Sequence, residues 1–289
     1  MARAYLFESW AFGDAFYADK YSPALSFDFY VLYKRIDSMA KIYHYTDIGT
    51  LALILHNRTI RFNRLDRVDD PDEFDFEQDG LHPAGYCFVS CWTRNQNESL
   101  PQWSMYGHGN HGVRIGLEED MFPLYSYQER TCFVSFEDNL KRSDFVICPN
   151  STSNERSITD ILYVDDPTNY RHKIIGYTGD TSFVNFNELG VYKSKDWAFQ
   201  KECRIMMTII PKITTQDTPC KSIKYAFEHN IPLDISFYDL ELKCDVYQGM
   251  EILLGPSISE SERLIVKSLM MKYLNRENCL TSKYAGKTK

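Results

Sequence analysis

The order of apolar and polar residues predicts a strand followed by a helix near residue 42. Ile42 and Tyr43 begin a β-like run, and the apolar residues of 51–55 then recur at helical spacing. Asp47 or Thr46 occupies the N-cap position of that helix. We therefore expect a strand–cap–helix unit with polar side chains at the C-terminal tip of the strand.

Further along the chain, alternating segments predict short strands separated by turns. The most regular segment is 201–210, where alternation places Glu202, Arg204 and Met206 on one face and apolar residues on the other. The other segments with a strand pattern are 59–63, 85–93, 111–117, 132–138, 161–166 and 245–254.

Two helical segments accompany these strands. Residues 102–109 predict a helical turn that ends at a glycine, and an amphipathic helix capped by Ser257 or Ser259 is expected near the C-terminus. The mixture predicts an α+β protein with a mixed, mainly antiparallel sheet core and flanking helices. The expected parts are an N-terminal helical extension packed on the core (1–40), one α+β domain (41–275) and a polar tail (276–289).

Composition and charge narrow the possible classes of protein. Hydrophobic residues make up 44% of the 289 positions and aromatic residues 15%, which excludes a disordered chain. The net charge of −8 opposes non-specific binding of nucleic acid by the whole surface, although a local basic groove remains possible. Eight scattered cysteines, the absence of a secretory signal pattern and the lack of a long apolar run favour a cytoplasmic protein without a membrane span.

Metal and hydrolase chemistries have little support. Cys87 and Cys91 would lie about 13 Å apart in an extended strand, which a single zinc ion cannot bridge, so His108 and His111 do not complete a zinc site. The acidic segment around Pro71 lacks the order of a calcium loop, and no serine-hydrolase elbow or P-loop is present. No metal cofactor is expected.

The tip of the first strand is one candidate site. His44, Tyr45 and Thr46 precede a helix N-terminus, which contributes partial positive charge and free backbone N–H groups. The alternative is that His44 is a hydrogen-bonded core histidine among ordinary strand aromatics.

Glu202 and Arg204 form the second candidate site. On a strand whose other face is apolar, the two residues could be a pair facing solvent. However, Trp197 and Phe199 lie just upstream and could cover part of this face. A carboxylate held beside a guanidinium stays ionised and oriented, as stabilisation of a developing cation requires.

Taken together, the motifs resemble a bacterial domain family of unknown function, DUF2971. The resemblance runs from about residue 41 to 275. It departs from the family pattern at Asp70, where an asparagine is usual, and at Gln200, where an additional acid is common before Glu202. The motifs, in chain order, are HYT (44–46), TIRFN (59–63), DDPDE (69–73), CFVSCW (87–92), WSMYGHGNHGVRIGL (103–117), DWAFQKECR (196–204) and ILLGPSIS (252–259).

A weaker, fold-level similarity is to the ADP-ribosyltransferases, and it implies NAD as substrate. In that fold a strand histidine holds a ribose, an aromatic residue packs on nicotinamide, and a late-strand glutamate binds the ribose 2′-hydroxyl. The similarity implies a catalytic role for Glu202. The cofactor-binding residues it implies are His44 and Thr46 at the ribose, Tyr45, Trp103 or Tyr106 as a stacking wall, Arg61 or Arg204 at the pyrophosphate, and Ser90 on the middle strand.

The leading hypothesis is therefore an NAD-using ADP-ribosyltransferase-like enzyme, for example a toxin or anti-phage effector that modifies protein or nucleic acid. A non-catalytic module that binds a nucleotide or a partner protein is the alternative. An RNA-directed nuclease or phosphotransferase is a further alternative. The acceptor and the oligomeric state are left open by the sequence.

Overall fold

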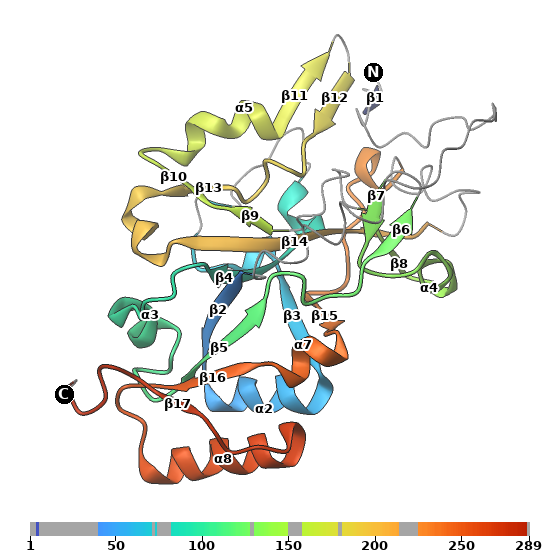
Figure 1. Cartoon of the computed structure of the whole chain (residues 1–289). Helices are drawn as coiled ribbons and strands as arrows, with labels where there is room; N and C mark the ends of the chain where they lie inside the picture. Colours follow the sequence, from blue (N-terminus) through green and yellow to red (C-terminus); the bar gives the residue numbers. More distant parts are fainter. Residues whose placement is uncertain are drawn as a thin grey trace, which may run out of the picture.

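A computed structural model describes most of the domain expected between residues 41 and 275 (Figure 1). The described residues are 4–5, 40–70, 73, 82–127, 130–149, 158–178, 181–213 and 225–287. The expected N-terminal helix lies outside them. From the first 39 residues only β1 (Ala4–Tyr5) is described, and it pairs in parallel with β12 (Thr181–Val184).

A mixed sheet forms the core, and its strands are paired mainly in antiparallel fashion, which confirms the predicted fold class. The strand order is β15-β3-β4-β2-β5-β16-β17, and β14 pairs with β4, β8 and β9. These strands are β2 (Lys41–Thr46), β3 (Thr59–Arg64), β4 (Cys87–Thr93), β5 (Val113–Glu118), β8 (Phe145–Ile147), β9 (Ile158–Asp160), β14 (Glu202–Pro211), β15 (Phe237–Glu241), β16 (Glu251–Leu254) and β17 (Leu280–Thr281).

Smaller strand pairs and short helices surround this sheet. The additional strands are β6 (Tyr125–Tyr127), β7 (Arg130–Cys132), β10 (Leu162–Val164), β11 (Ile175–Thr178) and β13 (Tyr192–Ser194). The short helices are α3 (Leu100–Met105), α4 (Phe136–Lys141), α5 (Arg171–Ile174) and α7 (Cys244–Gln248), with 3₁₀ turns η1 (Leu65–Arg67), η3 (Pro83–Tyr86), η4 (Pro167–Tyr170) and η5 (Lys195–Gln200).

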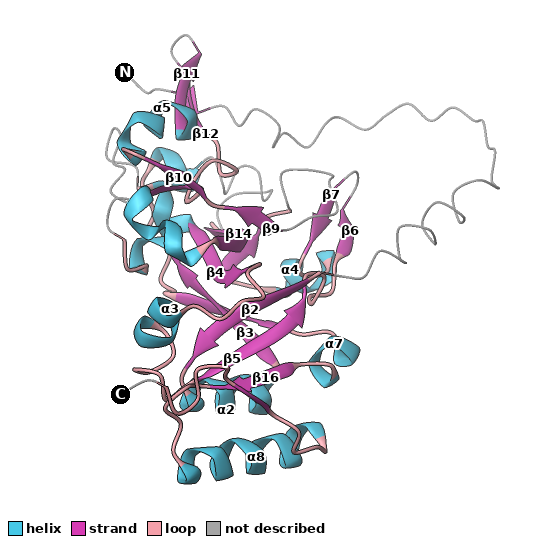
Figure 2. Cartoon of the chain, turned by 60° about the vertical axis from the view of Figure 1, so that its left-hand side comes forward, coloured by secondary structure: helices cyan, strands magenta, loops and turns pink. Residues whose placement is uncertain are grey.

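Two longer helices pack together beside the sheet. In both views α2 (Ile48–Asn57) lies between the strands and α8 (Glu260–Leu274) (Figures 1 and 2). Asp47 is the N-cap of α2 and accepts a hydrogen bond from Thr50 N at 2.8 Å. Ser259, rather than Ser257, caps α8 and forms a capping box with Glu262. No helix in the described ranges has the length and apolar character needed to cross a membrane.

Three predictions from the pattern were wrong or only partly right. The strand expected at 132–138 ends at Cys132, because Ser135 accepts a hydrogen bond from Asp138 N and caps α4. The first half of 245–254 is α7, and only β16 is a strand. The expected polar tail contains β17, which pairs in parallel with β16.

A split in the main sheet creates the space for a site. β14 pairs with β4 from Cys87 to Thr93 along one edge. On the other edge, β3 pairs only near Val89 and β2 only at Thr93. Within the described chain, residues 90–92 therefore have no strand partner on that edge, and the side chain of His44 forms a hydrogen bond with Cys91 O there.

Candidate active site

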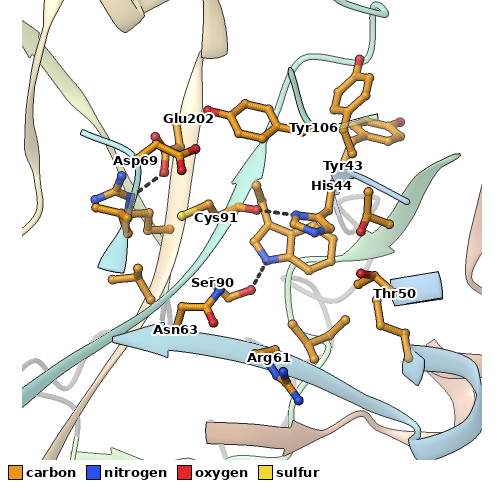
Figure 3. Close-up of a pocket in the computed structure, with 18 of the residues that line it drawn as sticks. Tyr43, His44, Thr50, Arg61, Asn63, Asp69, Ser90, Cys91, Tyr106 and Glu202 are labelled. Atoms are coloured by element: carbon orange, nitrogen blue, oxygen red, sulfur yellow. Dashed lines mark hydrogen bonds and ion pairs between the residues drawn. The ribbon is translucent and has the colours of Figure 1, made fainter. Parts of the chain in front are cut away.

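A cavity of about 520 Å³ occupies the split, a volume typical of small-molecule and cofactor sites (Figure 3). Its walls include residues of β2, β3, β4, β13, β14, β15 and α2, together with Arg67, Gln102, Tyr106 and Gln200. Of the residues predicted from the sequence, the structure brings the following to this one cavity: His44, Tyr45, Thr46, Arg61, Ser90, Tyr106, Glu202 and Arg204.

His44 lines the cavity and is held by the unpaired edge of β4. Its Nδ1 lies 2.8 Å from the backbone oxygen of Cys91, and its ring lies 5.3 Å from that of Trp92. Burial lowers the pKa of His44 below its ordinary value, so the ring is neutral at pH 7. Because a carbonyl can only accept, Nδ1 carries the proton and donates it, which leaves Nε2 as an acceptor.

The strand that carries His44 is fixed by close backbone packing at Thr46. The loop that follows α3 passes against the end of β2, and a Cβ on Gly112 would lie 2.2 Å from Thr46 O. Gly255, which directly follows β16, approaches the same segment, and its backbone N donates to Gly112 O at 2.9 Å. The glycines of the loop at 107–112 therefore allow close packing between loops next to the site.

Trp103 does not line the cavity. It is fully buried, and its Nε1 donates to Glu98 at 2.9 Å. Its ring lies 4.8 Å from that of Tyr45 in an edge-on arrangement, so it supports a wall residue from behind. The aromatic side chains that line the cavity itself include Tyr43, Tyr45, Trp92 and Tyr106.

Four buried charged residues form a closed ring at the other end of the cavity, with alternating signs. Arg204 Nε donates to Glu202 at 2.5 Å, and both terminal nitrogens of Arg204 bind Glu73. Lys193 Nζ lies 2.9 Å from Glu73 Oε1 and 3.2 Å from Glu202 Oε2. We call these residues, Glu73, Lys193, Glu202 and Arg204, the charge ring.

The environment keeps Glu202 ionised. Its burial alone would raise the carboxyl pKa, but the charges of Arg204 and Lys193, with hydrogen bonds from the side chains of Arg204 and Cys91, lower it to about 2. The exposed fractions of the Glu202 and Arg204 side chains are 7% and 1%, so a solvent-facing pair is excluded. Trp197 covers Lys193, at 4.8 Å from its nitrogen to the ring centroid.

Tyr106 and Gln200 form a polar wall next to Glu202. Gln200 Nε2 donates to the Tyr106 hydroxyl at 2.7 Å, while Gln200 Oε1 is buried and has no hydrogen-bond partner among the described residues. Burial raises the pKa of Tyr106, and the negative charges of Asp69 and Glu202 raise it further, so the hydroxyl remains protonated. Figure 3 shows Tyr106 and Glu202 at the same end of the cavity.

The arginines differ in their freedom to bind an anion. Arg204 donates hydrogen bonds to Glu202, Glu73 and the backbone oxygen of Gly190. It is therefore not available for the contact with a pyrophosphate that the sequence suggested. Arg61 is exposed but makes two hydrogen bonds to Asp239, at 2.8 and 2.9 Å. Arg67, which the sequence did not single out, also lines the cavity and is exposed.

Comparison with known proteins gives a family match, and it covers a part of the chain that carries several residues of this site. A model of the family described as "Protein of unknown function (DUF2971)" matches residues 102–205. The family resemblance is confirmed over this range. No curated protein and no solved structure matches the chain. The matched range includes Tyr106, Lys193 and the two ring residues on β14, whereas His44 precedes it.

Two residues of the charge ring, Glu73 and Lys193, were missed by reasoning from the sequence. Lys193 lies in a short strand between weakly patterned segments, so alternation alone does not reveal its role. Glu73 is the last residue of the acid-Pro-x-Glu motif, and this motif was the one feature of the sequence that could have pointed to its role. In the part of the chain that the structure describes, no group of three or more His, Cys, Asp or Glu side chains is placed to hold a metal ion.

Proposed function

We propose that this protein is an NAD-using ADP-ribosyltransferase-like enzyme. The observation that supports the proposal most is that an ionised glutamate and a neutral histidine, 158 positions apart, line the same cavity. Transfer of ADP-ribose requires one fixed negative charge beside the reacting ribose and neutral groups that orient its hydroxyls.

The reaction would use these residues in distinct roles. The bond between C1′ of the ribose and the nicotinamide nitrogen breaks, and its electron pair leaves with nicotinamide. Glu202 stabilises the positive charge that develops at C1′. His44 Nε2 accepts a hydrogen bond from a ribose hydroxyl, and Tyr106 provides an aromatic wall. A hydroxyl, amine or amide group of a protein or nucleic acid then attacks C1′ and loses its proton.

The pyrophosphate would lie toward the exposed side of the cavity. Arg61 and Arg67 line it there, and both side chains are accessible to solvent. Guanidinium groups bind phosphate oxygens through several N–H donors at once. This placement replaces the expected contact with Arg204.

A second candidate function, a non-catalytic nucleotide-binding module, is favoured by the charge ring. Both oxygens of Glu202 already accept hydrogen bonds from Arg204 and Lys193. A glutamate with this many partners could serve to shape a binding pocket rather than to promote a reaction. The two functions differ in turnover, not in the ligand that binds.

Turnover of labelled NAD by the purified chain, alone and with cell lysate or nucleic acid, tests the proposal. We expect nicotinamide release or label transfer that is lost in Glu202→Gln. The matched control is Glu251→Gln, a glutamate that pairs with Lys41 outside the cavity, and it should retain activity. Because Glu202 belongs to the charge ring, Glu202→Gln will also lower stability, so the assay temperature must lie well below its Tm.

The alternatives give different results in the same experiment. Thermal stabilisation by NAD or ADP-ribose without any product would support the binding module. Activity that survives in Glu202→Gln would contradict the assignment of the catalytic carboxylate. If neither turnover nor stabilisation occurred, NAD would be excluded as the ligand.

A further inference from the structure

The charge ring connects three separate parts of the chain. Glu202 and Arg204 are on β14, Lys193 is on β13, and Glu73 belongs to the acid-Pro-x-Glu motif. All four side chains are at least nine-tenths buried. A motif that the sequence singled out without assigning it a role is therefore in contact with the strand that carries Glu202.

The geometry of the ring restrains Glu202 from two sides. Its Oε1 accepts from Arg204 Nε at 2.5 Å, and its Oε2 accepts from Lys193 Nζ at 3.2 Å. Each cation is in turn bound to Glu73, Lys193 Nζ at 2.9 Å and Arg204 Nη2 at 3.1 Å. A carboxylate with one partner can rotate about its last torsion, whereas two fixed partners define its plane.

We propose that Glu73 and Lys193 are positioning residues that hold the Glu202 carboxylate in one orientation toward the cavity. For its effect on catalysis, the proposal rests on the function proposed above. Glu73 acts through both cations, because it fixes the guanidinium plane of Arg204 and the ammonium of Lys193 at the same time. Lys193 acts directly on the second oxygen of Glu202.

Charge balance gives the ring a property that can be tested. Two anions and two cations are neutral together, so removal of Glu73 alone leaves two buried cations facing one carboxylate. Removal of Lys193 alone leaves two carboxylates facing one guanidinium. Removal of both restores neutrality but leaves Glu202 with a single charged partner, Arg204. Stability and orientation can thus be separated.

The test compares Glu73→Gln, Lys193→Met and the double variant, with Asp66→Asn as control. Asp66 is an acid of the same segment that pairs with Arg64 outside the charge ring. We expect both single variants to lose Tm, and the double variant to be more stable than the sum of the two losses predicts. We expect kcat for NAD to fall about tenfold to a hundredfold in the double variant, with little change in KM.

Two results would overturn the positioning role. If the double variant recovered both Tm and kcat, the ring would serve charge balance alone. If the single variants folded and kept the wild-type kcat, orientation of Glu202 would not depend on them. Asp66→Asn should match the wild type in both Tm and kcat. That result would show that the losses come from the charge ring and not from any change of charge in the acidic segment.

A second measurement does not require any enzymatic activity. The carboxyl ¹³C signal of Glu202 reports its titration, and Lys193→Met should titrate at higher pH than the wild type, since a neighbouring positive charge has been lost. If the wild type were inactive but this shift occurred, the ring would still hold Glu202 and only the proposed enzymatic function would fail. An unchanged titration in Lys193→Met would overturn the inference whatever the activity.

Discussion

At one end of the cavity, His44 is held by a hydrogen bond to a backbone carbonyl, whereas at the other end Glu202 is held by cations that a further acid holds in place. The position of His44 depends on backbone packing and on a neutral imidazole. That of Glu202 depends on matched charges brought from three segments. One cavity thus positions its polar groups by two means, and these differ in their sensitivity to mutation and to pH.

A similar contrast separates the two arginine pairs of the cavity. Arg61 and Asp239 are joined by two hydrogen bonds, but their side chains are 46% and 29% exposed. Arg204 and Glu202 are almost fully buried. Water and salt screen the first pair, whereas the second has lost its hydration and relies on its protein partners.

The largest effect is therefore expected from Arg204→Met. It leaves Glu73 and Glu202 buried with only Lys193 between them, and we expect a loss of about 3–5 kcal/mol in the free energy of unfolding. Arg61→Met, the matched control, should cost about 0–1 kcal/mol. Urea denaturation of both variants measures the difference. Similar losses in the two would show that burial does not distinguish these pairs.

A smaller loss of stability is expected at the neutral end, from Gly112→Ala. The added methyl group meets Thr46 O at 2.2 Å, so backbone has to shift beside the strand that carries His44. We expect a loss of about 1–3 kcal/mol, as for other overpacked sites. Gly85→Ala is the control, because its methyl group would meet no atom within 4 Å, and its loss should stay below about 0.5 kcal/mol. Equal Tm values for the two variants would argue against close packing at Thr46.

The sequence predicted the elements whose pattern is local. Alternation identified β4 and β14, and the cap before the apolar run identified β2 and α2. These elements carry His44 and Glu202, which is why both were found as candidates. Their proximity depends on the pairing of β4 with both β2 and β14, and no local pattern encodes that pairing.

The residues that complete the charged end were harder to predict for a physical reason. Lys193 is on a three-residue strand whose partner, β10, is equally short, so its burial comes from tertiary packing. Glu73 was one acid among several in a segment that looked solvated. A buried charge is recognised only when its partners are known, and here the partners lie at least nine positions away.

The smallest effect concerns pH and distinguishes the two ends by the pH range in which each loses its stabilisation. Burial lowers the pKa of His44 below 6.5, so the unfolded chain binds a proton more readily and stability falls as the pH drops below that value. Between pH 7.5 and 5.5 we expect a loss of roughly 1 kcal/mol that His44→Gln lacks. Glu202 contributes nothing in this window, since its stabilisation is lost only as the pH falls from about 4.5 toward 2. Urea denaturation at the two pH values measures the difference, and an identical slope in the wild type and His44→Gln would mean that the histidine accepts a proton in the folded protein as readily as in the unfolded chain.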